Sequence, residues 1–211
     1  MVICIVGQIA SGKSTVAELM KEKGYKTVEM GDVVREEMSK RNLEIDSKSL
    51  RNFSAELRSS YGNDVVARLT LKELRRLGGT SMSNTVITGM RSTYEEAYFK
   101  KSIKGLVVVA VLAPESIRFA RIKKRNKPDD PKTLEEFRAI EKKELGGFSA
   151  KGDFAHGILH AIETADYVLL NTGTTAQLRK DVYSLLEAIE SQHKYLEKHG
   201  TREHAYNKRK G

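Results

Sequence analysis

The feature that most constrains this chain is a short apolar run that leads directly into a glycine-bounded turn. Residues 1–6 (Met-Val-Ile-Cys-Ile-Val) are apolar without interruption and mostly β-branched, which predicts a strand buried on both faces. Residues 7–15 read Gly-Gln-Ile-Ala-Ser-Gly-Lys-Ser-Thr and match the pattern G-x-x-x-x-G-K-[ST]. A helical pattern follows to residue 23, and this strand–loop–helix order distinguishes a phosphate-binding P-loop from a chance match.

The residue types in this loop suit the binding of a triphosphate. Gly7 and Gly12 let the backbone curl so that several N–H groups point at one anion. The helix that begins near Lys13 adds the positive end of its dipole, Lys13 brings a full charge to the β- and γ-phosphates, and Ser14 offers its hydroxyl to Mg²⁺. The predicted nucleotide-binding residues of the loop are Gly7, Gln8, Ala10, Ser11, Gly12, Lys13, Ser14 and Thr15.

Length and cysteine content favour a single domain in a reducing compartment. A chain of 211 residues is long enough for one α/β domain with a substantial core. Its one cysteine, Cys4, lies in the predicted first strand and cannot form an intramolecular disulfide, so we expect a cytoplasmic protein. No apolar stretch reaches membrane-spanning length. The first strand is needed for the loop, so we do not expect it to be a signal peptide.

The net charge of +9 permits a nucleic-acid partner. Much of the positive charge is concentrated at residues 118–127 and 198–210. Enzymes that transfer phosphate also collect lysine and arginine where their substrates dock, and this is the favoured interpretation.

Further along the chain, apolar strand patterns alternate with helical ones. Strands are expected at residues 25–29, 85–88, 106–112 and 165–171, and helices at 33–41, 47–60, 64–77, 92–101, 115–126, 133–144, 158–162 and from 174 onward. This alternation predicts a mainly parallel sheet with right-handed crossovers. The polar segment 127–152 is the best candidate for a mobile lid. The last helix carries an apolar stripe of Leu178, Val182, Leu185, Ile189 and Leu196, which we expect to pack on the sheet, with a coiled-coil partner as the alternative.

Two short motifs are interpreted as accidental. Asn126-Lys127-Pro128-Asp129 spells the guanine-reading N-K-x-D motif, but it follows a basic helix instead of a buried strand, and no D-x-x-G accompanies it. His156 and His160 lie one helical turn apart but lack the glutamate and the third ligand that a zinc site needs.

Several motifs favour a kinase. Gly31-Asp32 with Arg35 follows the second strand, and Gly89 with Arg91 ends the third, at the sheet edge where ligands bind in such folds. Arg118, Arg121 and Arg125 share one helix face. Their guanidinium groups repel one another unless anions join them, and phosphate oxygens suit the guanidinium fork. Alternatively, Asp129 and Asp130 neutralise them locally.

Together these motifs resemble the P-loop kinases of the nucleoside monophosphate and dephospho-coenzyme A type. More narrowly, they are similar to an archaeal P-loop family related to dephospho-coenzyme A kinase and adenylate kinase. The resemblance extends over nearly the whole chain and is carried by residues 7–14, Gly31, Asp32, Arg35, Gly89, Arg91, Ser92, Arg118, Arg121, Arg125, Asp129, Asp130, residues 165–168, Asn171 and Gly173.

The resemblance implies a three-layer α/β fold with a parallel sheet of about five strands in the order 2-3-1-4-5. It implies one P-loop kinase-like domain at residues 1–199, with acceptor-binding helices within 32–77, a closing lid within 127–152, and a basic, disordered tail at 200–211. By analogy Gly31, Asp32 and Arg35 would face the acceptor and Arg91 its phosphate. The three helix arginines would serve the donor phosphates and the transition state, and Asn171 to Gly173 would lie near the adenine.

One position departs from the pattern. Such kinases often carry an acidic residue at the end of the third strand, which holds the water shell of Mg²⁺ or accepts the substrate proton, and this chain has Thr88 there. Either Asp32 takes over this role, or metal handling is weak and turnover slow.

The predicted function is therefore transfer of the γ-phosphate of Mg-ATP to a small nucleotide or dephospho-coenzyme A-like acceptor. The catalytic residues would be Lys13, Asp32, Arg91, Arg118, Arg121 and Arg125. The alternatives are an NTP-binding regulatory protein with a nucleic-acid or protein partner, and a plain NTPase switch.

Overall fold

The computed structural model describes residues 1–78, 82, 84–146 and 157–199. Met1–Thr172 forms one compact unit, and Gly173–Gly211 forms a second. The predicted tail at residues 200–211, His156 and the last part of the predicted lid lie outside the described residues.

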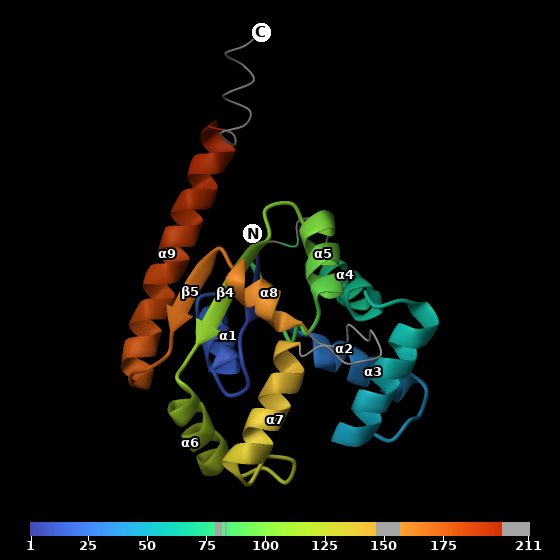
Figure 1. The fold of residues 1–211 in the computed structure, drawn as a ribbon. Helices are drawn as coiled ribbons and strands as arrows, with labels where there is room; N and C mark the ends of the chain where they lie inside the picture. The colour runs from blue at the N-terminus through green and yellow to red at the C-terminus, as the bar shows by residue number, and fades with distance from the viewer. Residues whose placement is uncertain (79–81, 83, 147–156, 200–211) are drawn as a thin grey trace. The chain divides into compact units, whose positions relative to one another are not determined.

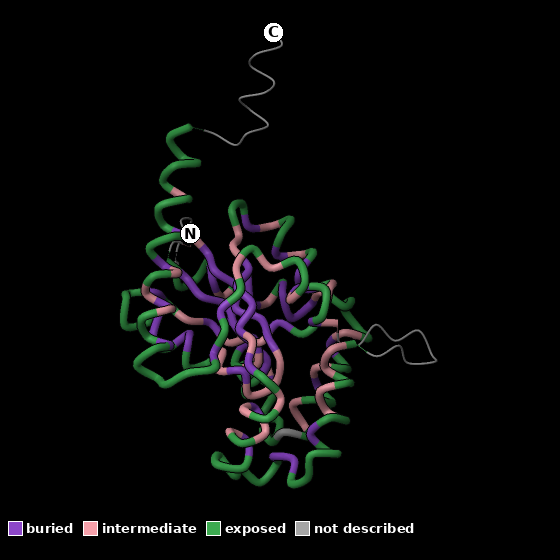
Figure 2. The backbone as a smooth tube through the Cα atoms, turned by 60° about the vertical axis from the view of Figure 1, so that its left-hand side comes forward, coloured by how far each residue is buried: buried purple, intermediate pink, exposed green. Residues whose placement is uncertain are grey.

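A parallel sheet of five strands, drawn in Figure 1, forms the centre of the first unit. The strand order is β2-β3-β1-β4-β5, which confirms the predicted topology. The strands are β1 (Val2–Val6), β2 (Lys26–Glu29), β3 (Thr85–Thr88), β4 (Val107–Leu112) and β5 (Tyr167–Leu170). All residues of β1 are buried. Figure 2 shows buried residues, in purple, concentrated in the middle of the first unit. An unbroken apolar run is what a strand covered on both faces requires.

Eight described helices complete the first unit. They are α1 (Lys13–Glu22), α2 (Met30–Lys40), α3 (Ser47–Tyr61), α4 (Val65–Gly78), α5 (Thr93–Ser102), α6 (Glu115–Arg125), α7 (Leu134–Leu145) and α8 (Ile158–Glu163). α1 packs on β1, β2 and β3, whereas α8 packs on β1 and β4. α2, α3 and α4 pack on one another between β2 and β3 in the sequence. None of the described helices is long and apolar enough to cross a bilayer.

The start of α2 differs from the prediction. The sequence pattern predicts a helix that begins at residue 33, but α2 already begins at Met30. The Glu29 carboxylate accepts the Asp32 N–H at 3.0 Å and so caps the helix three residues early. The last residue of β2 is therefore also the cap of the next helix.

Two predicted helix starts have different capping. At α7 the full capping box is present, with Thr133 and Glu136 satisfying each other's backbone N–H groups. At α5, Ser92 accepts the Glu95 N–H, but the Glu95 carboxylate accepts the N–H of Arg91 at 2.8 Å. The capping box of α5 is therefore only half formed, because the carboxylate of the buried Glu95 binds a different N–H group.

The described part of the second unit is mainly α9, Thr175–His199. Its buried residues are Leu178, Val182, Leu186 and Ile189. Leu186 takes the place that the sequence pattern assigned to Leu185, and Leu196 is exposed. What this stripe packs against stays a prediction.

Candidate functional site

The site is built on the bend between β1 and α1. Gly7 has φ +146°, and a Cβ atom there would lie 2.2 Å from the carbonyl oxygen of Val111 on β4. Gly12 has φ +107°, and a Cβ atom there would lie 2.1 Å from Nδ2 of Asn171. Both positions therefore favour glycine for the backbone conformation, and Gly7 requires it also for the close approach of β4.

Lys13 folds back over this bend. Its Nζ donates to the carbonyl oxygens of Gly7 at 2.7 Å and Gln8 at 2.8 Å. Burial lowers the pKa of Lys13 to about 8; Glu144 acts against this shift, while Arg91 and Arg118 add to it. The Lys13 side chain is therefore still mostly protonated at pH 7, and its charge lies near those of Arg91 and Arg118. Such a position suits an anion with several negative charges.

Arg118 and Arg121 on α6 reach the bend and bind its backbone. Nη1 of Arg121 donates to the carbonyl oxygens of Ala10 at 3.2 Å and Ser11 at 3.1 Å, and Nη2 donates to that of Asn171 at 3.0 Å. Arg118 is almost fully buried, and its Nη1 lies 3.4 Å from the carbonyl oxygen of Ile9. With their carbonyl groups bound in this way, the loop residues keep one conformation.

The third arginine of the series has a different partner. Arg125 forms a two-pronged ion pair with Asp130, with Nε 2.9 Å from Oδ2. Asp130 also accepts the N–H of Lys127, so this pair closes the turn after α6. The alternative of local neutralisation thus describes Arg125, whereas Arg118 and Arg121 contact the loop.

The side chain after β5 also fastens the bend. Asn171 is buried, and its Nδ2 donates to the carbonyl oxygen of Ser11 at 2.8 Å. Gly173, the other residue expected near the adenine, belongs to the second unit. Ser14 and Thr15 are exposed at the start of α1, and Ser11 is buried.

Three of the predicted acceptor residues, Gly31, Asp32 and Arg35, gather around the carboxylate of Glu29, which no sequence motif marks. Glu29 is paired in register with Thr88 at the end of β3. A Cβ atom at Gly89 would lie 2.4 Å from its Oε1, and one at Gly31 would lie 2.7 Å from its Oε2. Arg35 contacts the same carboxylate at 3.4 Å and forms a closer ion pair with Asp32. An acidic residue is therefore present at this edge of the sheet, one strand away from the position where it was sought.

Arg91 is held on both its backbone and its side chain. Its N–H is bound by the buried Glu95, which also forms an ion pair with Arg58 of α3 at 3.0 Å. Its Nη1 lies 3.3 Å from Oε1 of Glu144 on α7. The loop after β3 is thus connected to both the α3 region and α7.

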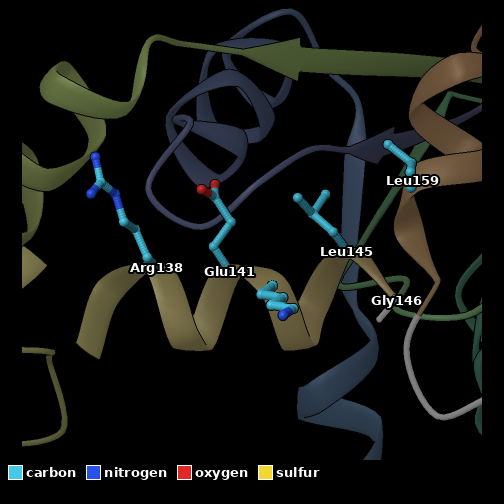
Figure 3. A pocket seen from close by; sticks show the side chains of 6 residues that line it. Arg138, Glu141, Leu145, Gly146 and Leu159 are labelled. Atoms are coloured by element: carbon cyan, nitrogen blue, oxygen red, sulfur yellow. The ribbon is translucent and has the colours of Figure 1, made fainter. Parts of the chain in front are cut away.

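A hollow of about 310 Å³ lies beside this site, between α7 and α8. It is lined by Arg138, Glu141, Lys142, Leu145, Gly146 and Leu159. Figure 3 shows Arg138 and Glu141 extending from the same side of α7. Glu141 pairs with Arg118, so this side of α7 faces the P-loop region.

Of the two histidines spaced one helical turn apart, His160 lies within the described residues and His156 does not. His160 has Nδ1 3.0 Å from the buried Glu96, which also binds Lys100. Burial acts to raise the pKa of Glu96, but the Lys100 and His160 partners hold it below its usual value. Across residues 1–146 and 157–199, apart from the gaps at 79–81 and 83, no group of three or more His, Cys, Asp or Glu could hold a metal ion.

The strand order and the loop geometry define a nucleotide-binding protein with a P-loop kinase-like fold. The sequence profile of the AAA domain family matches residues 3–144. A UPF0200 protein from Thermococcus onnurineus is 34% identical over 195 residues, covering 92% of this chain and 100% of the relative. The chain belongs to the UPF0200 protein family, which confirms the expected archaeal P-loop relationship.

Solved structures agree with this fold. A shikimate kinase from Bacteroides thetaiotaomicron matches with a TM-score of 0.54 and 14% identity, covering 90% of this chain and 98% of that one. A dephospho-CoA kinase from Campylobacter jejuni matches with a TM-score of 0.51 and 17% identity, covering 89% of this chain and 96% of that one. At these identities the likeness is one of fold.

Proposed function

We propose that this protein is a cytoplasmic phosphotransferase that moves the γ-phosphate of Mg-ATP to a small acceptor, a nucleotide or a dephospho-coenzyme A-like molecule. The observation that carries the proposal is the convergence of Lys13, Arg118 and Arg121 on one glycine-bounded loop. Phosphoryl transfer needs charge neutralisation and alignment more than covalent help.

On the donor side, the loop N–H groups and the Lys13 ammonium would hold the phosphates. Arg121 keeps the loop in place and Arg125 holds the turn after α6, so these two are proposed as positioning residues. Lys13, Arg91 and Arg118 would contact the transferred phosphate groups. Asn171 and Gly173 remain the candidates for the adenine side.

The residues present also fit Mg²⁺. The ion prefers oxygen ligands and keeps several waters, and the loop offers the exposed Ser14 hydroxyl. When bound, Mg²⁺ would neutralise charge that develops between the β- and γ-phosphates.

On the acceptor side, Gly31, Asp32, Arg35 and Arg91 would bind the second substrate. A phosphate oxygen of a nucleotide acceptor, or a hydroxyl of a dephospho-coenzyme A-like acceptor, attacks the γ-phosphorus, the bond to the β-phosphate oxygen breaks, and ADP leaves. The hydroxyl proton has to pass to a carboxylate, for which Glu29 and Asp32 are the candidates. Glu29 is the better placed, because it lies over Gly89 at the end of β3.

The test is a screen of the purified protein with Mg-ATP and a panel of nucleoside monophosphates and dephospho-coenzyme A. We expect a phosphorylated product with one class of acceptor, and its loss in Lys13→Ala. Hydrolysis of ATP with no acceptor product would instead support the NTPase switch. Salt-sensitive RNA or DNA binding that is lost on deleting residues 200–211 would support a nucleic-acid partner.

A further inference from the structure

Cations of the proposed triphosphate site already face carboxylates, and these carboxylates come from α7. Glu141 forms an ion pair with Arg118, and Glu144 pairs with Arg91 at 3.3 Å. The negative charge of Glu144 also raises the pKa of Lys13, against the larger opposite effect of burial. Glu141 and Glu144 are three residues apart, so they project from the same side of the helix, the side on which Figure 3 shows Glu141.

Independent contacts hold α7 in this position. Phe137 is fully buried, and the Arg118 guanidinium lies 5.3 Å from the centre of its ring. Arg138 forms a two-pronged ion pair with Glu115 at the start of α6, at 2.7 and 2.9 Å. Since the helix is fixed by both an aromatic and an ionic contact, its two acids are placed by the fold and are not accidents of long surface side chains.

We propose that Glu141 and Glu144 are built-in competitors of the nucleotide phosphates. A guanidinium group binds a carboxylate and a phosphate through the same N–H fork, so a phosphate chain that uses Arg91, Arg118 and Lys13 has to displace both acids. The Glu141 and Glu144 side chains therefore leave these cations when the nucleotide enters, while α7 keeps its other contacts. This inference rests on the proposed function, since it takes the same three cations to be the phosphate ligands.

A selectivity follows from this exchange. The two acids neutralise two of the cations. The net binding free energy of an anion is therefore only the difference between its own contacts with these cations and the carboxylate contacts that it replaces. A single phosphate replaces one carboxylate at best, whereas a triphosphate chain can replace both. The free protein should therefore discriminate strongly against inorganic phosphate.

The experiment is calorimetric titration of the full chain with ATP, ADP and inorganic phosphate. Glu144→Gln should bind ATP about three- to fivefold more tightly, because an exposed ion pair contributes up to about 1 kcal/mol. Glu141→Gln should bind about tenfold more tightly, since its pair is more buried. Inorganic phosphate should gain at least as much as ATP in both variants, because each variant lacks one of the acids that exclude it.

The matched control is Glu115→Gln, which loosens α7 through Arg138 without unmasking any cation of the site. It should leave ATP affinity within about twofold. If the melting curve of Glu141→Gln shows that this variant does not stay folded, Glu144→Gln alone decides, since the Arg91–Glu144 pair is less buried than the Arg118–Glu141 pair.

Unchanged or weaker ATP binding in Glu144→Gln would overturn the competitor role, as would an equal gain in Glu115→Gln. In either case ATP binding by the wild type leaves the proposed function standing. Absence of ATP binding in the wild type and all variants would overturn the proposed function itself.

Discussion

The donor and acceptor sides of this site are constructed by different kinds of contact. The P-loop is fixed by residues from distant parts of the chain, with Arg121 and Asn171 bound to the Ser11 carbonyl group. On the acceptor side, Asp32 and Arg35 contact each other and Glu29 within two helical turns. The Asp32 and Arg35 side chains are 70% and 44% exposed. The donor side is thus preformed by tertiary packing, whereas the charged groups of the acceptor side are within reach of solvent and ligand. We expect substitutions on the donor side to affect stability and ATP binding together, and those on the acceptor side to affect turnover alone.

The largest effect is expected for Lys13→Ala. The Lys13 ammonium lies on the P-loop, where it donates to the Gly7 and Gln8 carbonyl oxygens. Its removal should lower the rate of ATP turnover by about 10³-fold. Steady-state assays with the acceptor found in the screen would measure this. Turnover within about fivefold of wild type would contradict the assigned role.

The next largest effect is expected for Glu29→Gln. The amide still accepts the Asp32 N–H and so preserves the helix cap, but it can no longer take up a proton. Transfer should fall by about 100-fold with ATP affinity unchanged. Glu36→Gln, which removes an exposed acid of the same helix, is the control. Equal effects of the two variants would remove Glu29 from the proposal.

A smaller effect separates Arg121 from Arg125. Arg121→Ala removes three contacts to loop and strand-end carbonyl groups and should cost about 2 kcal/mol of unfolding free energy. It should also weaken ATP binding by about tenfold. Arg125→Ala, whose partner is Asp130, should leave ATP binding within about twofold. Chemical denaturation with parallel ATP titrations measures both; a matched loss of affinity in the two variants would mean that the loop does not depend on Arg121.

The smallest effect is a pH dependence. Burial lowers the pKa of Lys13 to about 8 in the free protein, and a bound phosphate chain would raise it again. ATP affinity should therefore be flat below pH 7 and fall by at most about tenfold per pH unit above 8. Lys13→Arg, which stays charged, should remove this slope.

For stability the sign is opposite. Between the folded pKa of about 8 and the ordinary lysine value of 10.5, the unfolded chain binds more protons. The unfolding free energy of the ligand-free protein should therefore rise through this window. The check is the melting temperature of the wild type and of Lys13→Arg, measured between pH 8 and 10.5. A wild-type melting temperature that falls relative to that of the variant as the pH rises would contradict the lowered pKa of Lys13.

Much of the fold was predictable because its signals are local. The apolar runs at β1 and β4 require burial on both faces, and the glycines at positions 7 and 12 require the bend that the structure shows. The alternation of strands and helices then leaves few ways to connect a parallel sheet.

The partners of the charged residues were not predictable in the same way. Helical spacing places Arg118, Arg121 and Arg125 on one face, but it does not reveal that one meets Glu141, one meets the loop and one meets Asp130. The acids of α7 lie 23 and 53 residues from their arginines, and the packing of Phe137 and the Arg138–Glu115 ion pair bring them there. Glu29 has one local sequence signal: it is an acidic residue that ends a strand immediately before a helix.

The most direct test of the account is an ATP titration of Gly7→Ala beside Gly105→Ala. Both glycines have positive φ, but a Cβ atom at Gly7 meets the Val111 carbonyl oxygen at 2.2 Å, whereas one at Gly105 meets nothing within 4 Å. If the bend after β1 is the phosphate cradle, Gly105→Ala binds ATP as the wild type does and Gly7→Ala loses binding. A folded Gly7→Ala that still binds ATP with wild-type affinity would contradict the account.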